Sequence, residues 1–160
     1  PAAARPGVRA RSAVAADAVV FGHAAIRAHR EASTERGGWH VHSVGAGVGA
    51  CARFGLGEAL NRWWPQLPLG TLAANLIGGY LVGVAIALLT LRSDLSPLWR
   101  LFIVTGVLGG LTTFSTFSAE VVTALERGQP AWALATAAAH LAGSLALTAL
   151  GLWTVRAALS

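Results

Sequence analysis

Two long runs without charge limit what this chain can fold into. The segments Leu69–Leu91 and Ala131–Val155 contain no Asp, Glu, Lys or Arg. A helix needs about twenty apolar residues to cross the hydrocarbon core of a bilayer, and both runs are long enough. Charged residues make up only 12% of the chain, about half of the usual share in soluble domains. These features predict an all-α integral membrane protein.

Two further segments are predicted to span the membrane although they carry polar residues. One contains the string Gly109–Thr113, made of Gly, Leu and Thr, and the other contains Arg53 and Glu58. Short connections with Pro separate the four segments, as expected where helices end. We therefore predict four transmembrane helices, the third broken in its middle, at about residues 41–60, 69–91, 98–125 and 131–155.

The beginning of the chain differs in composition from the rest. Six of the twelve Arg lie within the first 36 residues, and no apolar run of membrane length occurs there. We expect residues 1–40 to be a disordered leader or a start-site artefact, and residues 41–160 to form the membrane domain. The net charge of +5 would attract nucleic-acid phosphate. No aromatic and basic platform accompanies it, so nucleic acid is not expected as a partner.

The Arg residues in the connections leave the orientation of the helices open. One side of the membrane would hold Arg92, Arg100 and Arg156, and the other Arg62 and Arg127. The positive-inside rule hardly distinguishes these two sets. Either the leader or the Arg inside the first span decides the orientation, or copies insert both ways and pair as antiparallel dimers.

Polar residues in the second and fourth spans form two pairs. Thr71 and Asn75 are four residues apart, as are Ser144 and Thr148, so each pair lies on one side of its helix. Asn75 can either hydrogen-bond a neighbouring helix or offer its amide N–H to a passing anion, with Thr71 extending the polar stripe. The hydroxyls of the fourth span can donate to an ion or bond back to their own helix.

The third span carries the most informative string, residues 109–118, in which seven residues are Gly, Ser or Thr. Two Gly followed by hydroxyl residues favour local unwinding, which a membrane tolerates only inside protein or around an ion or water. Carbonyls freed in this way suit a hard cation such as sodium. The alternative is a kinked helix whose backbone is satisfied by Ser and Thr side chains. Phe114 and Phe117 share a helix face, either for packing or with positive ring edges that stabilise an anion.

Ionisable residues inside predicted spans usually indicate function. Arg53 and Glu120 are such residues, and they can also form a structural ion pair. His140 faces either the bundle interior or lipid. The sequence has neither a nucleophile placed beside a base nor a metal-binding spacing of Cys and His, so an enzyme is not expected.

Three motifs resemble the CrcB/Fluc family of fluoride channels. They are Gly45–Arg53, Pro68–Gly78 and Gly109–Glu120, and the similarity extends from about Gly45 to Trp153. The resemblance implies a fluoride-selective channel that passively exports cytoplasmic fluoride and so lowers its toxicity. It also implies a multi-pass protein of the bacterial inner membrane that assembles as an antiparallel dual-topology homodimer with two pores.

The resemblance implies roles for individual residues as well. A structural sodium ion at the dimer centre would be held by the backbone carbonyls of Gly109 and Thr112 of each subunit. The fluoride pore would be lined by residues of the last three spans. Asn75, Phe114 and Phe117 match the family's pore residues, Ser144 and Thr148 match its polar fourth-helix positions, and Thr71 joins them through the polar stripe. Arg53 and Glu120 match motif positions to which no role is assigned.

Two features depart from the family pattern. Residues Gly37–Ser43 stand where a short apolar run usually leads into the first helix, and His140 stands where some relatives have Asn. The main alternative function is a proton-coupled transporter of the small multidrug type, for which Glu120 is the only candidate coupling carboxylate. A structural subunit of a larger assembly is the third possibility.

Overall fold

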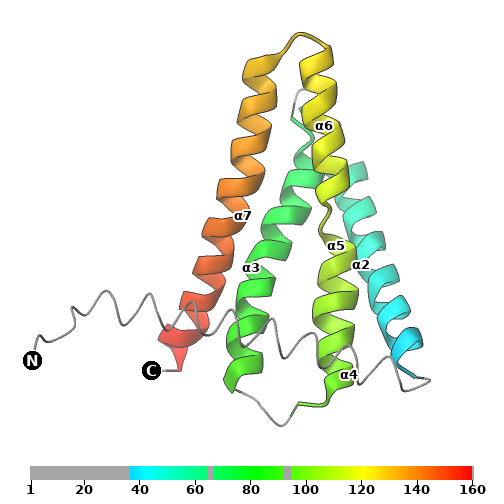
Figure 1. Ribbon diagram of the computed structural model, residues 1–160, viewed down its shortest axis with the longest axis vertical. Coiled ribbons are helices and arrows are strands. Elements are labelled where there is room, and N and C mark those ends of the chain that lie inside the picture. The colour runs from blue at the N-terminus through cyan, green and yellow to red at the C-terminus, as the bar shows by residue number, and fades with distance from the viewer. Residues whose placement is uncertain (1–36, 65–66, 92–94, 160) are drawn as a thin grey trace, which may run out of the picture.

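The computed structural model describes residues 37–64, 67–91 and 95–159, and every regular element in these ranges is helical (Figure 1). The predicted leader, residues 1–40, lies outside the described residues except for its end. The first described helix, α2, spans Gly38–Leu60. It begins slightly before the predicted position and includes Trp39 and His40 in its first turn.

Three helical segments in the described part of the chain are long and apolar enough to cross a membrane. The first is α3, Leu69–Leu91, and the last is formed by α7, Pro130–Ala158. Between them, the segment Pro97–Glu126 consists of several shorter helices. All three coincide closely with predicted spans, in agreement with an all-α membrane protein. α2 is not among the three, so a fourth crossing stays a prediction.

The segment between α3 and α7 changes its helical form along its length. It begins with α4, Pro97–Arg100, continues as a wider π-helix η1, Leu101–Leu108, and then as α5, Gly109–Leu111. Thr112 and Thr113 have extended backbones, with φ/ψ of −83°/154° and −150°/121°. Helical structure resumes in α6, Phe114–Glu126. We call the two extended residues the interruption.

The two glycines predicted to unwind remain helical in α5. An added Cβ on Gly110 would overlap the carbonyl oxygen of Ala46 in α2. Gly110 is therefore required by the close approach of two helices, which is the usual reason for a small residue in a membrane protein. The unwinding lies one step further along, at the two Thr.

The helices form one bundle in which α7 packs against both α3 and α6, while α2 packs against η1, α5 and α3 (Figure 1). Glycines set the crossing of α3 and α7. An added Cβ on Gly83 would overlap the carbonyl oxygen of Thr148, and one on Gly151 would overlap that of Tyr80. Gly49 of α2 has the same relation to the carbonyl of Val107.

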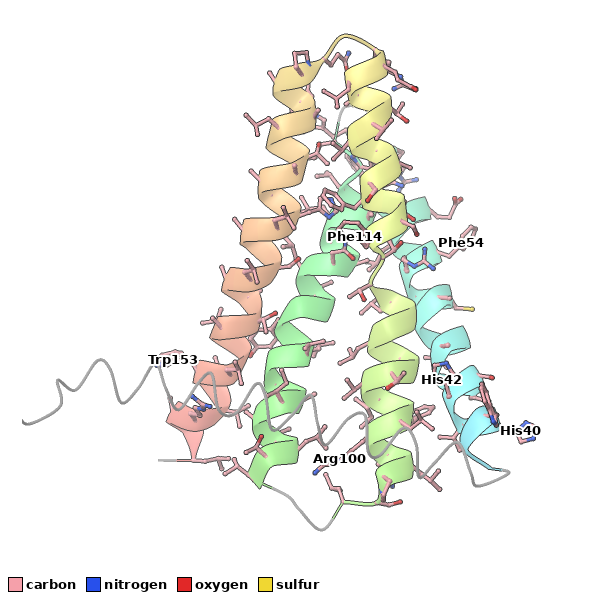
Figure 2. All side chains as sticks on the ribbon, viewed as in Figure 1. His40, His42, Phe54, Arg100, Phe114 and Trp153 are labelled. Atoms are coloured by element: carbon pink, nitrogen blue, oxygen red, sulfur yellow. The ribbon has the colours of Figure 1, made fainter. Side chains whose placement is uncertain are left out.

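The outer surface of the chain is apolar, and tryptophans lie near both ends of the bundle. Trp39, Trp99 and Trp153 belong to one end, the lower end in Figure 2, where His40 and Arg100 are also labelled. Trp63, Trp64 and Trp132 belong to the other end, and the rings of Trp64 and Trp132 are 6.2 Å apart. Such aromatic belts are typical of the two interfaces between a bilayer and water.

Candidate functional site

Asn75 joins α3 to the interruption through its whole side-chain amide. Its Oδ1 accepts a hydrogen bond of 2.8 Å from the backbone N–H of Thr113, and its Nδ2 donates one of 3.0 Å to the Thr113 carbonyl. Nδ2 also lies 3.0 Å from Nδ1 of His140 in α7. The Asn75 side chain thus provides hydrogen-bond partners for the N–H and the carbonyl of Thr113, which would bond to other backbone groups in a continuous helix.

These contacts determine which nitrogen of His140 carries the proton. The backbone N–H of Thr113 can only donate, so the Asn75 oxygen must face it and the Asn75 NH₂ group must face His140. Nδ1 of His140 therefore accepts, and in the neutral ring the hydrogen resides on Nε2. The side chain of His140 is 3% exposed, and its ring stacks on Phe117 with centroids 4.8 Å apart.

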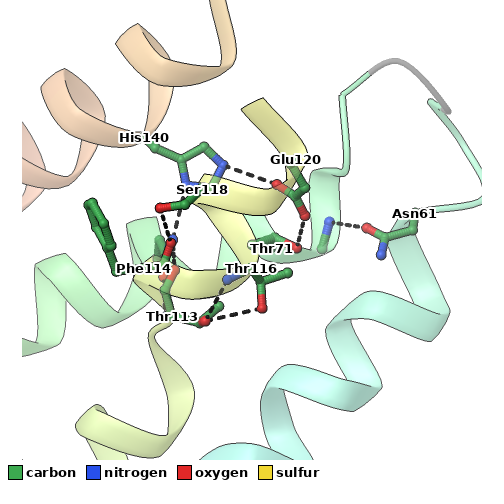
Figure 3. Close-up of polar contacts among 10 residues, drawn as sticks. Asn61, Thr71, Thr113, Phe114, Thr116, Ser118, Glu120 and His140 are labelled. Atoms are coloured by element: carbon green, nitrogen blue, oxygen red, sulfur yellow. Dashed lines mark hydrogen bonds and ion pairs between the residues drawn. The ribbon is translucent and has the colours of Figure 1, made fainter. Parts of the chain in front are cut away.

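The Nε2 atom of His140 faces Glu120 of α6 across a gap. It lies 4.0 Å from Oε2 of Glu120, as Figure 3 shows, and neither atom has a hydrogen-bond partner among the described residues. This distance is too long for a direct hydrogen bond. The other carboxylate oxygen accepts a bond of 2.6 Å from the hydroxyl of buried Thr71. Polar groups from α3, α6 and α7 thus meet at one level of the bundle.

The two predicted pore aromatics lie at the start of α6. The rings of Phe114 and Phe117 pack edge to face, with centroids 5.4 Å apart and an interplanar angle of 71°. Phe117 is buried between Phe114 and His140, whereas Phe114 is 73% exposed on the single chain. The structure brings Phe117 together with Asn75 and His140, and leaves Phe114 at the surface of the subunit.

Ser144 and Thr148 follow His140 on α7 by one and two turns, but Thr148 serves the helix packing. Its hydroxyl donates to the Ser144 carbonyl at 2.9 Å and to the Gly79 carbonyl of α3 at 3.0 Å. The first is the bond back to its own helix that the sequence left open as an alternative. The hydroxyl hydrogen of Thr148 is therefore engaged within the subunit.

The carbonyls of Gly109 and Thr112, the predicted sodium ligands, both lose their helical partners. In a continuous helix they would accept from the N–H groups of Thr113 and Thr116. The Thr113 N–H donates instead to Asn75, and the Thr116 N–H donates to the Thr113 hydroxyl at 3.2 Å. Free carbonyl oxygens are suitable ligands for a hard cation, so these residues fit the predicted ion. The described residues contain no cluster of three His, Cys, Asp or Glu that would hold another metal.

Arg53 of α2 contacts the backbone of α5 just before the interruption. Its Nε donates a hydrogen bond of 3.1 Å to the carbonyl of Gly110. The structural alternative was an ion pair between Arg53 and Glu120. Among the described residues these two side chains have other partners, since Glu120 accepts its hydrogen bond from Thr71. Arg53, Thr71 and Thr113 line a groove of about 390 Å³ that is partly open to the outside.

His140 is the residue whose importance the sequence did not establish. It contacts Asn75 and Phe117 and faces Glu120, and these three partners come from two other helices. The available signal was that it is the only ionisable residue within residues 131–155, since such residues are rare in membrane spans. Its partners could not be deduced because they are distant in the sequence.

Known proteins match this chain over most of its predicted membrane domain. The family model described as CrcB-like protein, Camphor Resistance (CrcB), matches residues 40–152. A protein of Burkholderia cenocepacia called fluoride-specific ion channel FluC is 62% identical over 114 residues, which cover 71% of this chain and 89% of the relative. Proteins with the same description from Burkholderia lata and Burkholderia pseudomallei are 61% and 58% identical with the same coverage.

Proposed function

The chain belongs to the CrcB family, and we propose that it is a fluoride-selective channel through which cytoplasmic fluoride leaves the cell passively. It is a multi-pass membrane protein of a family of ion channels rather than of enzymes. The relatives described as fluoride-specific ion channels support fluoride as the ion. Passive efflux would lower the toxicity of fluoride, and we place the protein in the bacterial inner membrane.

One observation carries the proposal, namely the set of neutral groups gathered beside the interruption. Phe117 packs edge to face with Phe114, Asn75 donates from its amide, and His140 directs an N–H into the gap before Glu120. A small anion must exchange its water for donors of this kind. Neutral donors and ring edges attract it more weakly than Lys or Arg would, and an ion that is held weakly can leave again.

The proposed pore follows the polar groups of α3, α6 and α7, and contains Thr71, Asn75, Phe114, Phe117 and Ser144. Thr148 lies further along α7, where its hydroxyl is engaged in helix packing. Both amide hydrogens of Asn75 are engaged, one with the Thr113 carbonyl and one with His140. A passing fluoride ion would therefore replace the contact with His140, since the contact with the backbone maintains the interruption.

We propose an antiparallel dual-topology homodimer with four spans per subunit, in which the interruption lies at mid-membrane depth. α2 supports the fourth span because it has Trp39 near its beginning and Trp63 just beyond its end. The exposed position of Phe114 supports a second copy, because a pore residue would otherwise face lipid. A structural sodium ion at the dimer centre would be held by the Gly109 and Thr112 carbonyls of both subunits.

The direct test is fluoride efflux from liposomes that contain the full chain. We expect fluoride to leave without an imposed proton gradient while chloride is retained. The Phe117→Ile variant is the matched control for leakage that does not pass through the pore. Equal efflux of both anions, or no efflux of fluoride, would contradict the proposal.

A proton-coupled transporter remains the second candidate because of one observation. Glu120 is a carboxylate within an apolar segment, with Oε2 facing His140 and without a hydrogen-bond partner among the described residues. Such a group can bind and release a proton during transport. If fluoride or an organic cation moves only when a proton gradient is imposed, this alternative is correct and the channel is not.

A further inference from the structure

We propose that Arg53 and Asn75 are positioning residues that, from two different helices, hold the interruption open and so keep the Gly109 and Thr112 carbonyls available to a cation. The cation part rests on the sodium site in the proposed function. Arg53 had no assigned role, and Asn75 was expected either to hydrogen-bond a neighbouring helix or to line the pore. Their contacts with the backbone of Gly110 and Thr113 indicate a structural role for both residues.

Four hydrogen bonds would have to form for α5 to continue into α6, from the N–H groups of residues 113–116. The first two would join the Gly109 carbonyl to the Thr113 N–H and the Gly110 carbonyl to the Phe114 N–H. The first donor is taken by Oδ1 of Asn75 at 2.8 Å, and the second acceptor is occupied by Nε of Arg53 at 3.1 Å. Asn75 therefore takes the single donor of the first bond, and Arg53 competes with the Phe114 N–H for the acceptor of the second.

The two side chains come from different helices, so the interruption is held from two directions. Asn75 belongs to α3 and Arg53 to α2. Thr113 supports the same state from within, because its hydroxyl accepts the Thr116 N–H and caps α6. This cap is a stable beginning for α6, and it takes the N–H of the fourth missing bond, which would otherwise go to the Thr112 carbonyl.

Arg53 also determines which carbonyls a cation can use. A guanidinium group at the Gly110 carbonyl repels a second positive charge there. Gly110 packs against Ala46 of α2, whereas an added Cβ on Gly109 would meet only the Val104 carbonyl, at 3.8 Å. The Gly109 backbone is thus accessible from the open side of the subunit, away from Arg53.

The hydrogen bond of Arg53 goes to the backbone and not to a proposed pore residue, although its side chain shares a groove with Thr71. Arg53 reaches the backbone of α5 from α2, while Phe117, His140 and Glu120 contact one another between α6 and α7. An Arg53 variant can therefore test the interruption without removing a proposed pore residue. An Asn75 variant would change both the interruption and the proposed pore.

The first experiment measures thermal unfolding of the full chain in detergent as sodium replaces N-methyl-D-glucamine at constant ionic strength. We expect Arg53→Met to raise the sodium concentration for half-maximal stabilisation about tenfold, as for the loss of one hydrogen bond from a charged donor. Arg53→Lys should restore much of the loss, because Lys retains a charged donor. The matched control is Arg62→Met, since Arg62 lies at the exposed end of α2 over Trp63. An unchanged sodium requirement in Arg53→Met would overturn the sodium part of the inference.

A second measurement does not depend on sodium. Amide hydrogen exchange of residues 109–118 should become slower at Phe114 in Arg53→Met, because the freed Gly110 carbonyl can accept its N–H. General loosening of the protein would make exchange faster instead, and this result, or unchanged exchange, would overturn the inference. If the wild-type chain shows no response to sodium, the proposed sodium site fails, while exchange at Phe114 still decides whether Arg53 holds the interruption open.

Discussion

The interface between α3 and α7 consists of polar side-chain contacts at one level and close backbone packing at another. At the level of Asn75 and His140, polar side chains reach across to other helices, and Nε2 of His140 has no hydrogen-bond partner among the described residues. At the level of Gly83 and Gly151, the backbones touch, and polar side chains find partners within the pair of helices, as in the 3.2 Å contact between Tyr80 and Thr154. We call these the polar level and the glycine level.

The comparison shows how one pair of helices can be rigid and still offer free polar atoms. Close backbone packing at the glycine level depends on small residues and dispersion forces, because lipid provides no hydrophobic force between helices. That packing holds α3 and α7 together, so the polar level does not have to satisfy every group internally. The atoms left without partners are then available to an ion.

The largest effect is expected at the polar level from Phe117→Ile. The substitution removes the ring that packs between Phe114 and His140, and with it the positive edge offered to an anion. Fluoride efflux from liposomes should fall about 100-fold, equivalent to about 2.7 kcal/mol in the barrier. Elution of the variant as the wild-type species in gel filtration serves as the control for assembly. Wild-type efflux would remove Phe117 from the pore.

The corresponding change at the glycine level is Gly83→Ala. The added methyl group would overlap the Thr148 carbonyl, and overpacking of this kind typically costs about 1–3 kcal/mol. Thermal unfolding in detergent should occur at a lower temperature, while efflux per folded protein stays close to wild type. Gly47→Ala is the control, since a Cβ there has no neighbour within 4 Å. Equal stability of the two variants would contradict the close packing.

Asn75→Ser sharpens the comparison because Asn75 serves both the backbone and the proposed pore. The shorter side chain cannot reach the Thr113 N–H, the Thr113 carbonyl and His140 at once. We expect efflux to fall about tenfold, the equivalent of about 1.4 kcal/mol. Cells that depend on this variant should stay sensitive to fluoride in growth assays. Full resistance at wild-type protein levels would show that Asn75 is not needed for permeation.

The smallest effect on efflux is expected from Thr148→Val, which separates packing from pore lining. The variant loses the hydroxyl shared between the carbonyls of Ser144 and Gly79, at a cost of about 1 kcal/mol in stability. Efflux should change by less than about twofold. A loss as large as that of Asn75→Ser would instead assign Thr148 to the pore and move the boundary of the polar level along α7.

Much of the helical framework could be predicted because apolar length is a local property. The predicted span at residues 69–91 has the same bounds as α3, and the other long segments differ from the predictions by only a few residues. The interruption lies within the predicted string Gly109–Thr113, but only at its two Thr, since Gly109 and Gly110 stay helical. Glycine permits unwinding, but the backbone unwinds where a side chain from another helix can take its hydrogen bonds, and here that is Asn75 at Thr113.

The sequence by itself determined that this chain is an all-helical membrane protein and which residue types are polar within it. Only the tertiary structure decided what those residues do. The contacts of Arg53 with Gly110 and of Asn75 with His140 join residues 57 and 65 positions apart, so no local pattern encodes them. A hydrogen bond depends on position in space to within a fraction of an ångström, whereas crossing a bilayer depends only on length and composition.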